Sequence, residues 1–416
     1  MKVFKFGGAS VNSVDRIRNV GDILKNFPNE KLLVVISAMG KTTNALETVV
    51  DSYFNNEKEK ALQLFAEIKK NHLEIAKQLT NKHVNQLTDL FTEVEWLLHD
   101  KPQRNYDYYY DQVVCIGELL STSIISDYLN QGGVSNQWID VRDILRTDDN
   151  FRDANIDWSF TGSRVHDSLL PIFNQTNIVV TQGFIGATDE NESTTLGREG
   201  SDYSAAVFAN LLDAESQTIW KDVESVMNAD PKQFPDATPI SELNYNEIIE
   251  MAYYGAQVIH PKTIKPLQNK NIPLYVKCFL DPLKSGTVIH NHPLNHLSPI
   301  IVLKEKQVMI EMISKDFSFV GEHHVARLYE QLGKLKLKPN LTQNAAISFT
   351  CVMDDRKEKN EKLAFGLADI FDVQMRNDLT LLTIRHYNNE IVNKLTAGKK
   401  ILLRQQTTET IQLLME

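Results

Sequence analysis

The first residues suited to chemistry stand at the end of a short strand-like segment near the amino terminus. Lys5 is followed closely by Gly7 and Gly8. Glycines let the backbone approach a phosphate group, and the compact ammonium of a lysine neutralises one. The segment therefore predicts a phosphate-binding turn with Lys5 beside the transferred group. A plain strand-turn-helix connection is the alternative, because it would contain the same residues.

A second candidate segment follows the continuous apolar run at 31–37. Ser37 ends this run, and Thr43 lies a few residues later among other small or hydroxyl-bearing residues. Ligands of open α/β sheets bind at the carboxyl ends of strands, where hydroxyl and backbone N–H groups hold carboxylate or phosphate. We expect such a ligand here, with an N-capped turn as the alternative.

Glu118 interrupts an apolar helical segment, with Ile116, Leu119 and Leu120 beside it. A carboxylate on a core-facing segment needs a partner, because its burial is costly otherwise. The ammonium group of a substrate would be such a partner. A structural lysine or arginine is the alternative.

The most specific segment contains an arginine and an aspartate around the start of a predicted helix. We expect Ser201 to cap a helix that runs to Leu212, which places Asp202 in the first turn, where the helix dipole favours a carboxylate. Arg198 precedes it and is suited to bidentate capture of a substrate carboxylate. Asp202 would orient Lys5, with simple helix capping as the alternative.

The elements that must position these residues alternate between strand-like and helix-like segments through residues 1–290. Continuous apolar runs predict buried strands, and three- and four-residue apolar spacing predicts helices. The polar loop after the strand at 217–221 is a weaker candidate for nucleotide binding. This order predicts an α/β sandwich with a mostly parallel sheet. The expected strands are 2–6, 31–37, 177–182, 217–221 and 272–278, and the expected helices are 14–25, 45–98, 113–129, 201–212 and 245–255.

The pattern changes after a polar, proline-containing stretch at 281–299. The order β-α-β-β-α-β is that of a small ferredoxin-like α+β module. We expect a catalytic domain at 1–290 and a second domain at 299–416. The residues after 298 fit one full module and a second, abbreviated one. The expected elements are strands at 307–314, 345–352, 379–386, 400–405 and 410–415, and helices at 320–332 and 360–371.

Composition narrows the class of protein. The 416 residues have a formal charge of −10, which disfavours nucleic-acid binding. The three cysteines are far apart and indicate neither a disulfide framework nor a zinc site. We see no apolar leader and no apolar run of membrane-spanning length, so we expect a cytoplasmic protein without a membrane partner.

Taken together, the segments occur in the order typical of the aspartate kinase branch of the amino-acid kinase family, which the sequence resembles over its first 290 residues. They read KFGGAS, ISAMGKTTN, GELLS, VTQGFIG, TLGREGSDYSA, KDVESVMNADPK and YGAQVIHPKT. The remainder looks like paired ACT regulatory modules. The resemblance implies one module at about 307–376 and an abbreviated one at about 299–306 with 377–416, and we expect no fused homoserine dehydrogenase. The resemblance implies ATP- and Mg²⁺-dependent phosphorylation of the L-aspartate side chain to 4-phospho-L-aspartate, the first step toward lysine, threonine and methionine. It implies no metal ligands from protein side chains.

The resemblance also implies roles for individual residues. Lys5 matches the lysine that stabilises the phosphoryl group in transfer, and Asp202 matches the aspartate that organises it. Arg198 and Glu118 match the groups that bind the carboxylate and the amine of aspartate. Other substrate-pocket positions match Ser37, Thr43 and Phe184. Nucleotide-binding positions match Gly7, Gly8, Ser10, Lys221, Asp222, Met227, Lys232 and Gln257.

Four positions depart from the commonest family pattern. Glu199 stands where a glycine is frequent, Lys221 where a threonine is, Met227 where a tyrosine is, and Gln257 where a lysine is. The last three bear on the nucleotide. They leave open an amino-acid-sensing protein with an inactive kinase half. A kinase for glutamate or acetylglutamate is the other alternative. His260 is expected to be structural.

Regulation follows from the resemblance alone. ACT modules commonly pair edge to edge and bind amino acids at the shared interface. The resemblance therefore implies a homodimer or higher homo-oligomer, with lysine or threonine as the effector. The positions expected to form the effector site are Phe319, Val320, Asn344 and Ile347, although the turn at 315–322 lacks the PGxx sequence of many ACT modules.

Overall fold

The computed structural model describes residues 1–80, 85–256, 258–294 and 297–416. The chain forms two compact units. The first contains residues 1–226, 239–249 and 258–293, and the second contains 227–238, 250–257 and 294–416. The expected domains, 1–290 and 299–416, differ from these units mainly in the two short segments that group with the C-terminal part of the chain.

An eight-stranded sheet forms the centre of the first unit. Every neighbouring pair is parallel except β11 with β12. The predicted mostly parallel sheet is confirmed. β1 (Lys2–Phe6) lies in the middle, between β2 (Leu32–Ile36) and β7 (Ser216–Lys221). All five residues of β2 are buried, which explains its unbroken apolar sequence. The order is β10-β12-β11-β7-β1-β2-β4-β3.

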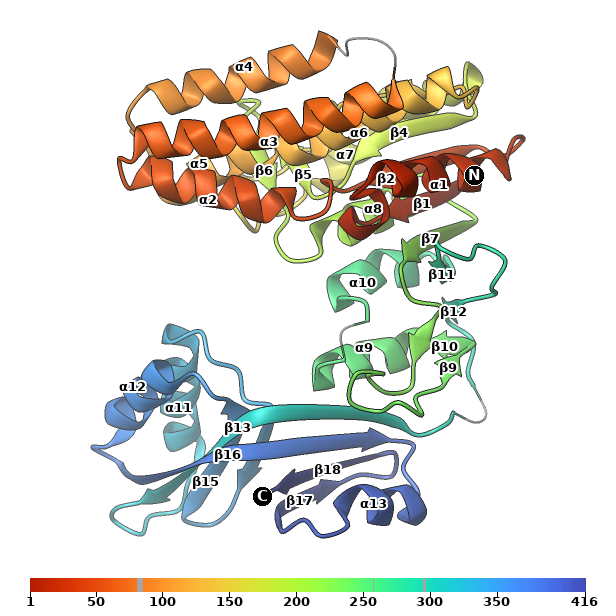
Figure 1. Cartoon of the computed structure of the whole chain (residues 1–416). Helices are drawn as coiled ribbons and strands as arrows, with labels where there is room; N and C mark the ends of the chain where they lie inside the picture. The colour runs from red at the N-terminus through yellow and green to blue at the C-terminus, as the bar shows by residue number, and fades with distance from the viewer. Residues whose placement is uncertain (81–84, 257, 295–296) are drawn as a thin grey trace. The chain divides into compact units, whose positions relative to one another are not determined.

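Helices cover both faces of this sheet (Figure 1). α6 (Ile116–Gln131) packs on β2 and β4, and α8 (Gly200–Leu211) packs on β1, β2 and β7. The helical region expected at 45–98 consists of α2 (Thr42–Phe54), α3 (Lys58–Leu79) and α4 (Asn85–His99). The helix expected at 113–129 belongs to two helices, because α5 ends at Val114 and α6 begins at Ile116. The remaining long helices are α1 (Val14–Lys25), α5 (Tyr106–Val114), α9 (Tyr245–Tyr254) and α10 (Pro261–Asn269).

Several short strands were not predicted. β12 (Thr287–His290) lies in the stretch expected to be a loop, where it pairs with β11 (Leu274–Cys278) and β10 (Glu242–Asn244). Strands of two to five residues carry too little periodicity to be recognised. The others in the first unit's sheets are β3 (Gln137–Trp138), β5 (Ile185–Ala187) and β6 (Ser193–Thr195), next to β4 (Ile178–Gln182), which was predicted.

The second unit is built on one antiparallel sheet of six strands in the order β14-β15-β13-β16-β18-β17. Its two central strands, β13 (Ile300–Ser314) and β16 (Phe371–Arg385), each have 15 residues. The segment expected at 299–306 and the strand expected at 307–314 therefore belong to one strand, interrupted only by irregular pairing between Lys304 and Met309. The other elements are α11 (Glu322–Lys334), β14 (Leu341–Asn344), β15 (Ser348–Asp354), α12 (Lys357–Leu367), α13 (Asn389–Thr396), β17 (Ile401–Gln406) and β18 (Thr410–Met415).

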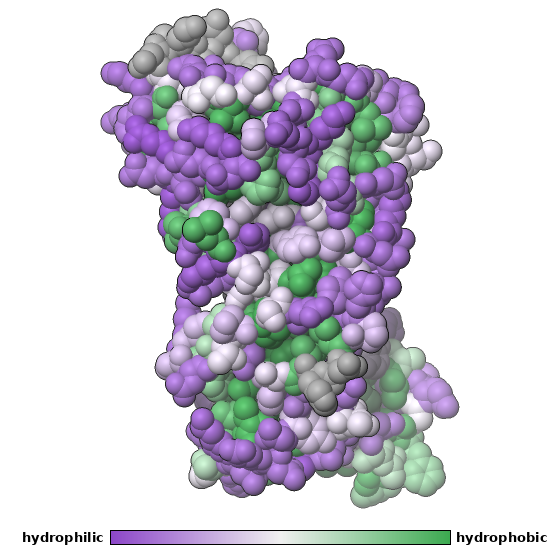
Figure 2. Space-filling view, turned by 90° about the vertical axis from the view of Figure 1, so that its right-hand side faces the viewer, coloured by the Kyte–Doolittle hydropathy of each residue, from purple (hydrophilic) through white to green (hydrophobic). Residues whose placement is uncertain are grey.

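Each module has a core of its own on this sheet, and a third hydrophobic cluster, with Val352 and Leu414, contains residues of both modules. One core gathers Val308, Leu328 and Phe371 with their neighbours, and another gathers Leu382, Leu413 and theirs. α13, which was not predicted, contributes Val392 to the second core. On the face of the molecule in Figure 2, hydrophilic residues predominate and hydrophobic residues form smaller groups between them. Among the helices of the described residues, none is long and apolar enough for a membrane span.

Candidate active site

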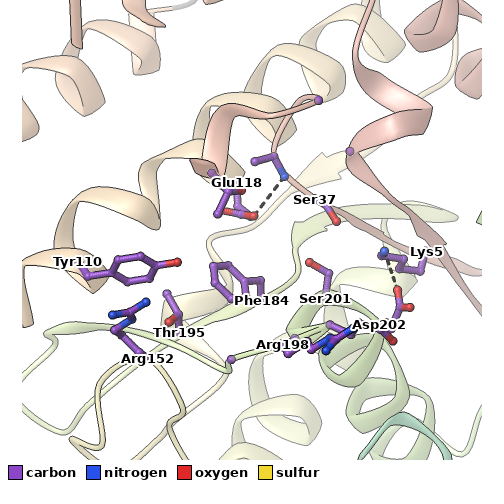
Figure 3. Close-up of a pocket in the computed structure, with 17 residues that line it drawn as sticks. Lys5, Ser37, Tyr110, Glu118, Arg152, Phe184, Thr195, Arg198, Ser201 and Asp202 are labelled. Carbon is purple, nitrogen blue, oxygen red and sulfur yellow. Dashed lines mark hydrogen bonds and ion pairs between the residues drawn. The ribbon is translucent and has the colours of Figure 1, made fainter. Parts of the chain in front are cut away.

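A cavity of about 460 Å³ opens at the carboxyl ends of β1, β2 and β4 in the first unit. This edge is where open α/β sheets bind ligands. Eight of the residues predicted from the sequence line it, and Figure 3 shows most of their side chains directed toward one another. They are Lys5, Gly8, Ser37, Thr43, Glu118, Phe184, Arg198 and Asp202.

A buried ion pair lies at one end of the cavity. The Nζ atom of Lys5 is 2.5 Å from Oδ1 of Asp202, and both residues are less than a tenth exposed (Figure 3). Lys5 reaches this place from the central strand β1, and Asp202 lies in the first turn of α8. The predicted contact between the two is therefore present. Because the pair is held by two rigid elements, the ammonium is fixed at the mouth of the glycine turn.

The glycine turn after β1 packs too closely to accept any other residue at position 8. A Cβ atom on Gly8 would lie 2.7 Å from the carbonyl oxygen of Ala38 and 2.9 Å from that of Gly40. The backbone N–H of Gly40 in turn donates to the carbonyl of Gly8 at 3.0 Å. The two loops that follow β1 and β2 are thus locked together. A short 3-10 helix, Gly8–Val11, precedes α1 and was not predicted.

Glu118 lies near the start of α6, where its carboxylate is 2% exposed. Oε1 accepts a hydrogen bond from the backbone N–H of Ala38 at 3.2 Å, whereas Oε2 has no partner among the described residues. No lysine or arginine forms an ion pair with it in the described part of the chain, which removes the structural alternative there. Burial raises the pKa of Glu118 to about 8. An unpartnered buried oxygen facing a cavity is suited to the ammonium group of a ligand.

Arg198 is exposed at the cavity wall, and its guanidinium has no hydrogen-bond or ion-pair partner within the described ranges. The adjoining Glu199 has a φ of +54°, in the left-handed region that favours glycine, which accounts for the glycine frequent at this position. Its Oε2 accepts from the N–H of His260 at 2.9 Å. Glu199, not Ser201, holds the N-cap position of α8, so the cap prediction was wrong. Ser201 belongs to the first turn.

The other substrate candidates are also held by local contacts. Phe184 has a φ of +72°, and its N–H donates to Oγ of Ser204 at 3.1 Å. The carbonyl of Ser37 accepts from Oγ of Ser121 at 2.8 Å. Thr43 lies in the first turn of α2. Left-handed residues such as Phe184 and Glu199 are costly and are concentrated at functional sites.

Only some of the residues predicted to bind the nucleotide lie in the first unit. Lys221 ends β7 beside β1, and its Nζ donates to the carbonyl of Val258 at 2.6 Å. Oγ of the buried Ser10 donates to the carbonyl of Trp220 at 3.3 Å. Asp222 is exposed directly after β7. Gly7 precedes the short helix, Met227 and Lys232 belong to the second unit, and Gln257 lies outside the described residues.

The four effector candidates lie close in the first module of the second unit. The N–H of Val320 donates to the carbonyl of Ala346 at 2.8 Å, so the loop before α11 runs beside the β14–β15 connection. Val320 is buried in the core of that module, whereas Phe319 and Asn344 are exposed and Ile347 is half-buried. A core position suits packing better than ligand contact.

Sequence reasoning missed the far wall of the cavity. Tyr110 from α5, Arg152 from a loop and Thr195 from β6 line it there (Figure 3). The carboxylate of buried Asp111 joins two of them, accepting from the N–H of Arg152 at 3.0 Å and from Oγ1 of Thr195 at 2.7 Å. Burial raises the pKa of Asp111 to about 6. No motif marks these residues, although an aspartate within an apolar helix was a signal of the same kind as Glu118.

No group of three or more histidine, cysteine, aspartate or glutamate side chains is placed to hold a metal ion within the described residues. Asp202 is already paired with Lys5, and Glu118 belongs to no such group among the described residues.

A mostly parallel α/β sandwich with a lysine and a glycine turn at its ligand-binding edge is suited to binding a phosphate group. The chain belongs to the amino acid kinase family, whose model matches residues 1–278. It is 29% identical over 409 residues to the lysine-sensitive aspartokinase 3 of Escherichia coli, covering 96% of this chain and 89% of that one. It is 31% identical to aspartokinase 1 of Arabidopsis thaliana, covering 85% of this chain and 63% of that one.

Solved structures agree. Escherichia coli aspartokinase III in complex with aspartate and ADP has a TM-score of 0.82 at 27% identity, covering 100% of this chain and 96% of that one. Clostridium acetobutylicum aspartate kinase also has a TM-score of 0.82, with 20% identity, which shows the same fold. The fold class expected from the sequence is confirmed.

Proposed function

We propose that the chain is an aspartate kinase, which transfers the γ-phosphoryl group of ATP to the side-chain carboxylate of L-aspartate. The observation that carries the proposal is the combination of groups in one cavity. It offers the fixed ammonium of Lys5 beside a glycine turn, the guanidinium of Arg198 and the buried Oε2 atom of Glu118, and the last two have no partner among the described residues. These match the phosphoryl group, the α-carboxylate and the α-ammonium of the amino acid. The kinship with aspartokinases supports the same assignment.

The reaction needs positioning and charge neutralisation more than covalent help from the protein. The β-carboxylate oxygen attacks the γ-phosphorus, the new P–O bond forms and the bond to the β-phosphate oxygen of ADP breaks. A carboxylate is ionised at neutral pH, so no general base is required. Lys5 stabilises the charge on the phosphoryl group in transfer, and Asp202 fixes the position of its ammonium. Glu118 and Arg198 hold the acceptor in line.

Mg²⁺ would enter with the nucleotide, as part of the MgATP substrate. It neutralises charge on the phosphates when bound. The residues after β7, Lys221 and Asp222, lie next to the glycine turn at the same edge of the sheet and are proposed to contact the nucleotide. Ser10 and Gly7 are proposed to support the turn.

The second unit is proposed to be a pair of ACT-like regulatory modules. A lysine complex of Escherichia coli aspartokinase III supports lysine as the effector, with threonine as the alternative. Phe319, Asn344 and Ile347 are the candidate contacts, with Val320 supporting them from the core. Assembly into a homodimer through these modules is part of the same proposal.

The proposal is tested by measuring ADP formation from MgATP with L-aspartate, L-glutamate and N-acetylglutamate as acceptors. We expect turnover on L-aspartate and suppression by added lysine or threonine. Turnover on glutamate or N-acetylglutamate in place of aspartate would overturn the substrate assignment. Binding of ATP or an amino acid without turnover on any acceptor would favour the amino-acid-sensing alternative.

A further inference from the structure

Arg152 is a cation on the cavity wall whose backbone is fixed in an unfavourable conformation. Its φ of +69° lies in the left-handed region, where a side chain is disfavoured. Asp111 imposes this conformation, because its Oδ2 atom accepts from the N–H of Arg152 at 3.0 Å and from the N–H of Thr195 at 2.8 Å. A Cβ atom on Gly197 would lie 3.2 Å from the carbonyl of Arg152, so the loop is also closely packed. The position of Arg152 is therefore specified by buried contacts.

The guanidinium of Arg152, by contrast, is held by partly exposed contacts. It lies over the rings of Tyr110 and Tyr106, 4.2 and 5.5 Å from their centroids. Its ion pairs with Glu47 and Asp107 are both 3.3 Å long, and all three side chains are at least 40% exposed. Exposed ion pairs of this kind contribute little and are readily exchanged for another carboxylate. A fixed backbone with a loosely paired head group is suited to a ligand-binding arginine.

Arg152 lies at the end of the cavity opposite the transfer site. In Figure 3, Tyr110 and Arg152 are on one side of Phe184, and the Lys5–Asp202 pair is on the other. A dicarboxylic acceptor that presents one carboxylate toward Lys5 has its second carboxylate directed away from it. On the proposed function, we infer that Arg152 is a further substrate-binding residue. It leaves Glu47 and Asp107 to share the α-carboxylate of the acceptor with Arg198.

The test compares Arg152→Gln with Arg104→Gln in the full chain. Arg104 is a matched control, because it lies over Tyr108 of the same helix at 4.3 Å and pairs with Glu192, yet does not line the cavity. Arg152→Gln should raise KM for aspartate about tenfold or more, as expected for one lost charge-assisted contact, with kcat within about twofold of wild type. KM for MgATP should not change. Arg152→Lys should recover part of the loss, and Arg104→Gln should match wild type.

A comparison of two acceptors distinguishes a binding role of Arg152 from a purely structural role. The α-amide of L-aspartate keeps the reacting carboxylate but lacks the charge that Arg152 would hold. Arg152→Gln should therefore change its use by less than about twofold, against tenfold for aspartate. An unchanged aspartate KM would overturn the inference. Equal losses on both acceptors would also overturn it, because Arg152 would then act only on the shape of the cavity.

Calorimetric titration of L-aspartate into the protein distinguishes failure of the proposed function from failure of the inference about Arg152. If the wild-type chain binds aspartate without turnover, the kinase proposal fails, and the ratio of Kd values between Arg152→Gln and wild type still decides the role of Arg152. If wild type neither binds nor phosphorylates aspartate, both are overturned.

Discussion

At the scale of single residues, the site depends on charges that the fold has fixed before any ligand arrives. Lys5 and Asp202 are buried together, so neither side chain must reorganise during transfer. Preorganised charge of this kind is usually the largest contribution to lowering a reaction barrier. Glu118 is the opposite case, since its carboxylate is buried without a cation. The substrate would supply that cation.

Lys5→Met removes the ammonium from the transfer site while keeping most of the side-chain volume. We expect kcat to fall about 10²–10³-fold, the usual cost of losing one preorganised donor. Lys2→Met on the same strand is the control, because Lys2 pairs with Glu30 away from the cavity. The two variants are compared by their steady-state kcat values. Unfolding midpoints confirm that each variant is folded. Near-native turnover of Lys5→Met would remove Lys5 from the mechanism.

Glu118 predicts a pH-dependent substrate affinity. Its pKa of about 8 leaves the carboxyl protonated at neutral pH in the free protein. An ammonium group favours the ionised form, so binding of aspartate at neutral pH should release a proton. Affinity should then weaken as pH falls below about 8, by up to tenfold per unit.

Calorimetry in two buffers of different ionisation enthalpy measures this proton release directly. Glu118→Gln is the matched variant and should bind aspartate more weakly and release no proton. A wild-type binding enthalpy that is the same in both buffers would contradict the role of Glu118.

At the scale of elements, the sequence predicted the strands and turns that carry the chemistry. β1, β2, β4 and β7 lie within a residue or two of their expected bounds, because each is a short segment of strand-forming residues that ends at a turn. The far wall could not be predicted in this way. Arg152 stands in a loop without periodicity, and only tertiary contact with Asp111 brings it to the cavity. The continuity of β13 was also not predicted, because polar residues between Lys304 and Met309, where the strand pairing is irregular, interrupt its apolar pattern.

Gly8→Ala tests the close approach of the two loops. The added Cβ atom would meet two backbone carbonyls within 3 Å, so the turn must shift. We expect the free energy of unfolding to fall by about 1–3 kcal/mol and turnover to fall with it. Gly333→Ala in α11 is the control, since nothing lies within 4 Å of its Cβ position; it should be neutral or stabilising by about 0.5–1 kcal/mol. Urea unfolding compares them, and equal stability of the two variants would contradict the packing argument.

At the scale of the whole molecule, the regulatory region is one sheet with three hydrophobic clusters rather than two separate modules. β13 and β16 each pass through both halves, so a change in one half is transmitted along shared strands. This continuity provides a physical route for coupling the two proposed ACT-like modules.

Leu413→Ala tests this continuity by removing buried volume from the core around Leu382. The expected cost is about 2–5 kcal/mol. Amide hydrogen exchange should quicken both at 300–304 and at 307–314, because both segments belong to β13. Leu328→Ala, in the core around Val308, should likewise quicken amide exchange in both segments of β13. Faster exchange confined to the half that carries the substitution would show that the modules open independently.

The central claim is that this chain phosphorylates the side-chain carboxylate of aspartate. Hydroxylamine traps an acyl phosphate as a hydroxamate, and chromatography against standards shows which carboxylate reacted. With MgATP and L-aspartate we expect aspartate β-hydroxamate, formed in proportion to ADP and lost in Lys5→Met. ADP release without hydroxamate, or hydroxamate formed from glutamate but not from aspartate, would contradict the claim.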